Sequence, residues 1–101
     1  MKINKKNRKN NEVSIVYGED NSINVKIFNN RILMSVVGSF DNNLKELEKI
    51  SGSKIYFRGN SIAIKGDKHA NEKVRDAIEY LIDRFRSDKK VDRNDIITSL
   101  N

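Results

Sequence analysis

Alternation of apolar and polar residues predicts four β-strands in this chain. They are Val13–Tyr17, Ile23–Ile27, Lys54–Arg58 and Ser61–Lys65. The alternation is strict in Ile23–Ile27, so the three apolar residues of this strand share one buried face. Gly59-Asn60 separates the last two strands and suits a two-residue hairpin turn, so we expect these strands to pair antiparallel.

Apolar residues that recur every three to four positions predict helices in the other segments. We expect helices over Arg31–Val37, from Asp41 to about Ser51, from Gly66-Asp67 to Phe85, and after Asp92 near the end of the chain. Asn29 or Asn30 can cap the first helix, and Asp41 is predicted to cap the second through its carboxylate. Three apolar residues then fall on one face of the second helix: Leu44, Leu47 and Ile50.

Together these elements predict an α+β domain. From residue 23 the order is strand, helix, glycine turn, helix, strand, strand, helix, and this β-α-α-β-β-α order resembles a type I KH domain. The resemblance implies an antiparallel three-stranded sheet with the helices on one face, to which the Val13–Tyr17 strand and a short C-terminal helix are added. We expect residues 12–101 to form this single KH-like domain.

A more specific resemblance is to the N-terminal domain of PhoH-like proteins. The matching residues are Asn29-Asn30-Arg31-Ile32-Leu33, Val37-Gly38, Asp41-x-x-Leu44-x-x-Leu47-Glu48, Gly52, Arg58-Gly59-Asn60-x-Ile62-x-Ile64-x-Gly66 and Asp92-x-x-Asp95-Ile96. In that family the domain precedes a P-loop ATPase domain, and RNA-related roles are proposed for the whole protein. The resemblance therefore implies an accessory domain.

This chain has no nucleotide-binding motif of its own. A Walker A loop requires a glycine followed by lysine, and none of the five glycines is followed by lysine. ATP and magnesium are thus expected only in the ATPase domain that the resemblance implies, and no cofactor is expected here. With a single histidine, His69, and no cysteine, nothing assembles a catalytic or metal site, so we expect a chain that is not an enzyme.

Basic residues are concentrated at the N-terminus. The net charge is +6, but five of the 20 basic residues lie in residues 1–11, which contain no acidic residue. The rest of the chain has 15 basic and 14 acidic residues and is nearly neutral. Residues 1–11 are predicted to be a disordered basic tail that adds a weak, salt-sensitive attraction to polyanions.

The composition also predicts where the protein resides. No apolar run is long enough to span a membrane, and no apolar segment follows the basic N-terminus as in a secretory signal. The absence of cysteine fits a reducing compartment. We therefore expect a soluble cytoplasmic protein with no membrane partner.

The glycine turn is the first candidate site. A nucleic-acid-binding KH loop reads Gly-x-x-Gly, and here the fourth position is aspartate: Gly38-Ser39-Phe40-Asp41. A carboxylate there opposes a phosphate by about 1 kcal/mol at 4 Å in water and about 4 kcal/mol at an effective dielectric of 20. Arg31, Lys45 and Lys54 are expected to flank the groove and favour phosphate. Phe40 either stacks on a base or packs into the core or a partner.

The Lys54–Arg58 strand is the second candidate site. Ile55 and Phe57 fall on one face of this strand, and the other face carries Lys54, Tyr56 and Arg58. The polar face is either a basic-aromatic platform for nucleic acid or an ordinary solvated strand face.

Two functions follow from these features. In the first, the Gly38–Asp41 loop and the Lys54–Arg58 edge hold a few nucleotides of single-stranded RNA with weak affinity. In the second, the domain packs on its own ATPase domain or on other subunits through an apolar end formed by Ile96, Ile97 and Leu100. The sequence leaves both open.

Overall fold

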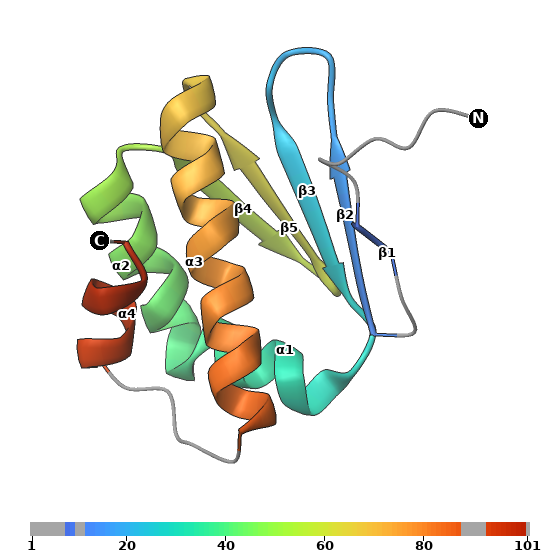
Figure 1. The fold of residues 1–101 in the computed structure, drawn as a ribbon, viewed down its shortest axis with the longest axis vertical. Coiled ribbons are helices and arrows are strands. Elements are labelled where there is room, and N and C mark those ends of the chain that lie inside the picture. Colours follow the sequence, from blue (N-terminus) through green and yellow to red (C-terminus); the bar gives the residue numbers. More distant parts are fainter. Residues whose placement is uncertain (1–7, 10–11, 88–92, 101) are drawn as a thin grey trace.

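Four five-residue strands and one two-residue strand pair side by side in one antiparallel sheet (Figure 1). The computed structural model of the protein describes residues 8–9, 12–87 and 93–100. The strands in these ranges are β1 (Arg8–Lys9), β2 (Val13–Tyr17), β3 (Ile23–Ile27), β4 (Lys54–Arg58) and β5 (Ser61–Lys65). Their order across the sheet is β1-β2-β3-β5-β4, which makes β4 an outer edge.

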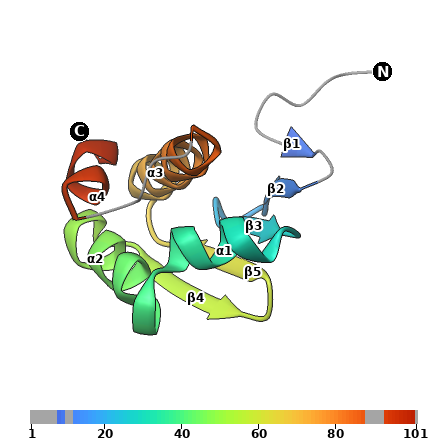
Figure 2. The same cartoon turned by 90° about the horizontal axis from the view of Figure 1, so that it is seen from below.

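The helices pack on one side of this sheet (Figure 2). They are α1 (Asn30–Val37), a short 3-10 turn η1 (Ser39–Asp41), α2 (Asn42–Ser51), α3 (Lys68–Arg86) and α4 (Arg93–Ser99). α3 crosses β3 and β5, α2 lies against β4, and α4 packs on α2 and α3. No helix in the described part of the chain covers the opposite face of the sheet, which we call the open sheet face.

The hydrophobic core fills the space between the sheet and the helices. Alternate residues of the central strands point into it, and Ile15, Val25 and Ile62 have no exposed surface. The periodic apolar residues of α3 face them, and six are buried: Ala70, Val74, Ala77, Ile78, Leu81 and Ile82. Burial of one such Leu or Ile side chain contributes about 1.5–3 kcal/mol. Phe85, the last residue of the predicted apolar repeat, is only partly buried.

The four predicted strands are confirmed at their predicted bounds, and the four predicted helices are present. The sheet is wider than the three-stranded sheet that we expected, and the Val13–Tyr17 strand that we expected in addition is part of it. All five residues of β2 pair with β3, and β1 pairs with β2 in turn. The physical reason is that Val13 and Ile15 of β2 are fully buried, so β2 contributes to the core as the central strands do.

The predicted apolar faces of α2 and of the C-terminal helix are only partly buried. Ile50 was expected on the buried face of α2, yet 47% of its surface is exposed because it lies in the last turn of the helix. At the C-terminal end, Ile96 of α4 and Leu100 directly after the helix are buried, whereas Ile97 is 41% exposed. α4 therefore folds back onto α2 and α3 of its own domain.

Within the N-terminal tail that was expected to be disordered, Arg8–Lys9 form β1. The other tail positions, 1–7 and 10–11, lie outside the described residues, as does Asp92, the expected cap of the last helix. The division into a tail of residues 1–11 and a domain of residues 12–101 remains a prediction.

Asn71 joins three separate segments at the start of α3. It is fully buried, accepts a hydrogen bond from Ser53 Oγ (2.8 Å), and donates to the carbonyls of Asn21 (2.9 Å) and Gly66 (3.0 Å). Buried polar groups are stable only when they are paired in this way. The network fixes the ends of β3, β4 and β5 relative to α3.

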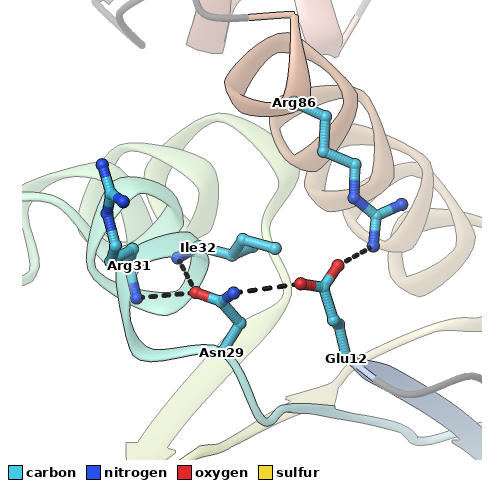
Figure 3. A network of polar contacts seen from close by, with 5 residues as sticks. All are labelled: Glu12, Asn29, Arg31, Ile32 and Arg86. Carbon is cyan, nitrogen blue, oxygen red and sulfur yellow. Dashed lines mark hydrogen bonds and ion pairs between the residues drawn. The ribbon is translucent and has the colours of Figure 1, made fainter.

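Glu12 makes a second junction at the other end of the molecule (Figure 3). Its carboxylate accepts hydrogen bonds from Arg86 Nη2 (2.7 Å) and from Asn29 Nδ2 (3.0 Å). Asn29 caps α1, because its Oδ1 accepts from the amides of Arg31 (2.9 Å) and Ile32 (3.1 Å). The start of β2, the start of α1 and the end of α3 are thereby tied together.

Candidate functional site

The Gly38–Asp41 loop has an unusual backbone. Gly38, Phe40 and Asp41 have φ values of 80°, 53° and 61°. With ψ at 172°, Gly38 occupies a region that is essentially restricted to glycine. A Cβ at position 38 would also lie 2.8 Å from Cγ of Asn43. A left-handed residue with a Cβ costs roughly 1–2 kcal/mol, so Phe40 and Asp41 store strain in this loop.

Hydrogen bonds hold the two helix ends together around the loop. Asn43 Nδ2 in the first turn of α2 donates to the carbonyl of Ser35 in the last turn of α1 (3.1 Å). The Gly38 amide donates to the carbonyl of Met34 (2.9 Å), and the Asp41 amide to that of Gly38 (3.3 Å). The loop conformation is therefore fixed by contacts on both sides.

Asp41 does not cap α2 as predicted. It occupies the N-cap position, but its carboxylate makes no capping hydrogen bond. A capping side chain reaches the helix amides from an extended backbone, whereas Asp41 is left-handed, with φ 61° and ψ 23°. The Asp41 carboxylate therefore does not occupy the amides of α2 that a phosphate would use. The negative charge remains.

Phe40 projects from the loop into solvent. Its exposed fraction is 89%, the highest among the large hydrophobic residues of the described chain that are exposed. Phe40 therefore does not pack into the core, which was one of the alternatives. The alternatives that remain are a stacking partner and a protein partner, and both require an aromatic ring that is accessible.

A hollow of about 200 Å³ lies beside the loop, between α2 and β4. We call it the α2–β4 groove. Leu44, Ile55 and Phe57 supply apolar surface, and Asp41, Lys45 and Glu48 supply charge. Glu48 Oε2 accepts a hydrogen bond from the Ile55 amide of the edge strand (2.7 Å). The lining of the groove is therefore more polar than apolar, and it carries two carboxylates and one ammonium.

The other predicted residues of β4 lie on the open sheet face. Ile55 and Phe57 pack toward the core, so the alternate residues Lys54, Tyr56 and Arg58 point the opposite way and are exposed. The α2–β4 groove beside the loop and these three side chains lie on opposite faces of the edge strand β4. The structure does not bring them together in a single groove.

The two remaining predicted cations, Lys45 and Arg31, also lie apart from each other. Lys45 lines the α2–β4 groove beside the loop. Arg31 is exposed in the first turn of α1, and its side chain points away from Glu12 (Figure 3). At a rise of 1.5 Å per residue, Arg31 lies about 10 Å along the helix from Gly38. Arg31 therefore does not flank the loop.

Sequence reasoning missed two cations on the open sheet face. Lys65 of β5 pairs with Lys54, and its Nζ lies 6.0 Å from the centre of the Tyr56 ring. Lys26 of β3 pairs with Ser61, the neighbour of Arg58. The alternation within each strand indicates that Lys26 and Lys65 point away from the core. Their proximity to β4 depends on the order of the strands in the sheet.

Other kinds of site find no support in residues 8–9, 12–87 and 93–100. These residues contain no group of three or more His, Cys, Asp or Glu that could hold a metal ion. His69 is exposed. In the same residues, no helix combines the length and the apolar character needed to cross a membrane.

Comparison with protein-family models, with curated proteins and with solved structures finds no match to this chain.

Proposed function

We propose that this domain binds single-stranded nucleic acid, RNA in particular, at the Gly38–Asp41 loop and the α2–β4 groove. The observation that carries the proposal is the 89% exposed Phe40 on a strained loop. A base stacked on an exposed aromatic ring contributes about 1–3 kcal/mol, and glycine at position 38 lets a phosphate backbone approach closely. The apolar surface of the groove accepts a neighbouring base.

The fold assignment is part of this proposal. In this assignment β3, α1, α2, β4, β5 and α3 would supply the elements of a type I KH domain, and the Gly38–Asp41 loop would correspond to the loop with which that module binds its ligand. We further propose, from the resemblance to PhoH-like proteins, that the domain is an accessory to a P-loop ATPase. ATP and magnesium would then belong to that other domain, and this chain would bind without catalysis in the cytoplasm.

Affinity at this site should be weak. Asp41 and Glu48 face the groove against Lys45 alone, so Coulomb attraction to a phosphate is small there. Binding is expected to depend mainly on stacking and therefore to vary little with RNA sequence.

Substitution of Phe40 by Ala tests the proposal. We expect the affinity for a short single-stranded RNA to fall about tenfold, which corresponds to the loss of about 1.4 kcal/mol of stacking. Ile50→Ala is the matched control, since it removes an exposed apolar side chain from the far end of α2. Equal affinities for the wild type and Phe40→Ala would refute a stacking role.

The competing proposal is a protein-interaction domain that uses the apolar C-terminal end. Ile96 and Leu100 are already buried against α2 and α3, so Ile97 is the one member of that set with a large exposed surface. This leaves the interaction proposal with less apolar surface than the sequence suggested, and we favour nucleic-acid binding.

A further inference from the structure

We propose that the open sheet face is a second contact surface for the same nucleic-acid strand, on the far side of β4 from the loop. This inference rests on the proposed function and adds a site to it. The surface is formed by the outward residues of four strands, and we define it by its central members: Lys26, Lys54, Tyr56, Arg58, Ala63 and Lys65.

The open sheet face is basic although the fold is nearly neutral. The outward positions of β2, β3, β4 and β5 hold four cations and no carboxylate. Lys54 and Lys65 are directly opposite each other in neighbouring strands. Like charges in that position repel each other, and the nearby carboxylate of Asp20 offsets this only at Lys65. A phosphate placed between these two side chains would relieve the repulsion.

Tyr56 supplies the aromatic component. It is 57% exposed, and its cross-strand neighbour is the small residue Ala63, which leaves room for a base beside the ring. Along β4 the outward residues follow the sequence cation, aromatic, cation, in steps of about 6.6 Å between Lys54, Tyr56 and Arg58. This alternation matches a chain of phosphates and bases better than it matches an acidic peptide, which offers no ring to stack.

The edge strand connects the two surfaces. Ile55 and Phe57 line the α2–β4 groove, while Lys54, Tyr56 and Arg58 lie on the open sheet face. A nucleic-acid strand that leaves the α2–β4 groove can therefore cross the edge of β4 and continue over the open sheet face. Short RNAs would occupy the loop side alone, and longer RNAs would reach both.

The test compares RNA of about 4 nucleotides with RNA of about 12 nucleotides, for the double variant Lys54→Gln/Lys65→Gln. We expect affinity for the longer RNA to fall about fivefold to tenfold, with a salt slope smaller by about 1.4, because two phosphate contacts are lost. Affinity for the shorter RNA should not change. Lys68→Gln/Lys73→Gln is the matched control, because it removes the same charge from exposed positions of α3.

Each outcome separates this inference from the proposed function. If the double variant binds the longer RNA as the control does, while Phe40→Ala weakens both lengths, the open sheet face is not a binding surface and the loop is. If the wild type binds neither length, both proposals fail. If the double variant loses binding to polyglutamate or to phosphatidylserine vesicles as strongly as to RNA, the face is a general polyanion surface, and its assignment to nucleic acid is overturned.

Discussion

The two sides of the β4 edge differ in charge and in shape. On the loop side, the α2–β4 groove has apolar surface but sets two carboxylates against Lys45. On the other side, the open sheet face has four cations around Tyr56 and no carboxylate at the outward positions of β2, β3, β4 and β5. The surface beside the Gly38–Asp41 loop and the surface with more cations are therefore on opposite sides of one strand. A sequence motif in a loop therefore does not show where on the surface the basic residues gather.

The two sides also differ in backbone conformation. The loop has three residues with positive φ, whereas β4 and β5 pair in regular register along all five residues. Substitutions in the loop should change both stability and binding. Substitution of Lys54 or Lys65 on the sheet face should weaken binding without loss of stability, because these like charges oppose each other in the sheet.

The largest effect on stability is expected for Gly38→Ala. A Cβ at this position is excluded both by the backbone conformation and by Asn43, so we expect a loss of about 2–3 kcal/mol in the free energy of unfolding. Gly52→Ala is the matched control, because Gly52 also has positive φ but nothing lies within 4 Å of an added Cβ. It should cost about 1 kcal/mol. Urea unfolding of both variants measures the difference, and equal losses would show that Asn43 does not restrict the loop.

A smaller effect, of opposite sign, is expected for Asp41→Gly. Glycine adopts the left-handed conformation of this residue without strain, which should raise the free energy of unfolding by about 0.5 kcal/mol despite the added freedom of the unfolded chain. Removal of the carboxylate should also tighten RNA binding about fivefold, as expected for about 1 kcal/mol of lost repulsion at 4 Å in water.

Asp67→Gly serves as the control for Asp41→Gly. The Asp67 carboxylate accepts a hydrogen bond from the Ala70 amide (2.9 Å) and caps α3 from an extended backbone. Its replacement should lower the free energy of unfolding by about 1 kcal/mol, through the lost cap and the freer unfolded chain. Destabilisation by both substitutions would mean that Asp41 supports α2 as the sequence suggested.

The smallest expected effect is the pH dependence of the free energy of unfolding that arises from the contacts of Glu12. Hydrogen bonds from Arg86 and then from Asn29 lower the pKa of Glu12 below its ordinary value of 4.5. A lowered carboxyl pKa contributes stability that is present above the ordinary value and is lost as the pH falls through the lowered one. The free energy of unfolding should therefore fall slightly in acid below pH 4.5.

Arg86→Gln should weaken this acid dependence, because it removes the main cause of the lowered pKa. Unfolding by urea at several pH values compares the two proteins. An unchanged acid dependence in Arg86→Gln would show that the contacts of Glu12 in Figure 3 do not stabilise the folded state.

Most of the fold could be predicted because it depends on local periodicity. Strict alternation gave Ile23–Ile27, and a 3.6-residue repeat gave the buried face of α3. The candidate site could be predicted only in part. Aspartate before a helix usually caps it, and nothing in the sequence signals the left-handed backbone of Asp41. The contact between Ser53 and Asn71, which are 18 residues apart, follows from tertiary packing and could not be predicted.

Chemical-shift mapping by NMR tests the central claim most directly. The wild-type protein, labelled with ¹⁵N, is titrated with a single-stranded RNA of about 4 nucleotides, the length that a KH loop accommodates. We predict that the amides with the largest shift changes lie at Gly38–Lys45 and at Ile55 and Phe57, around the α2–β4 groove. Unchanged shifts in this region at saturating RNA, or changes confined to α4, would contradict nucleic-acid binding at the loop.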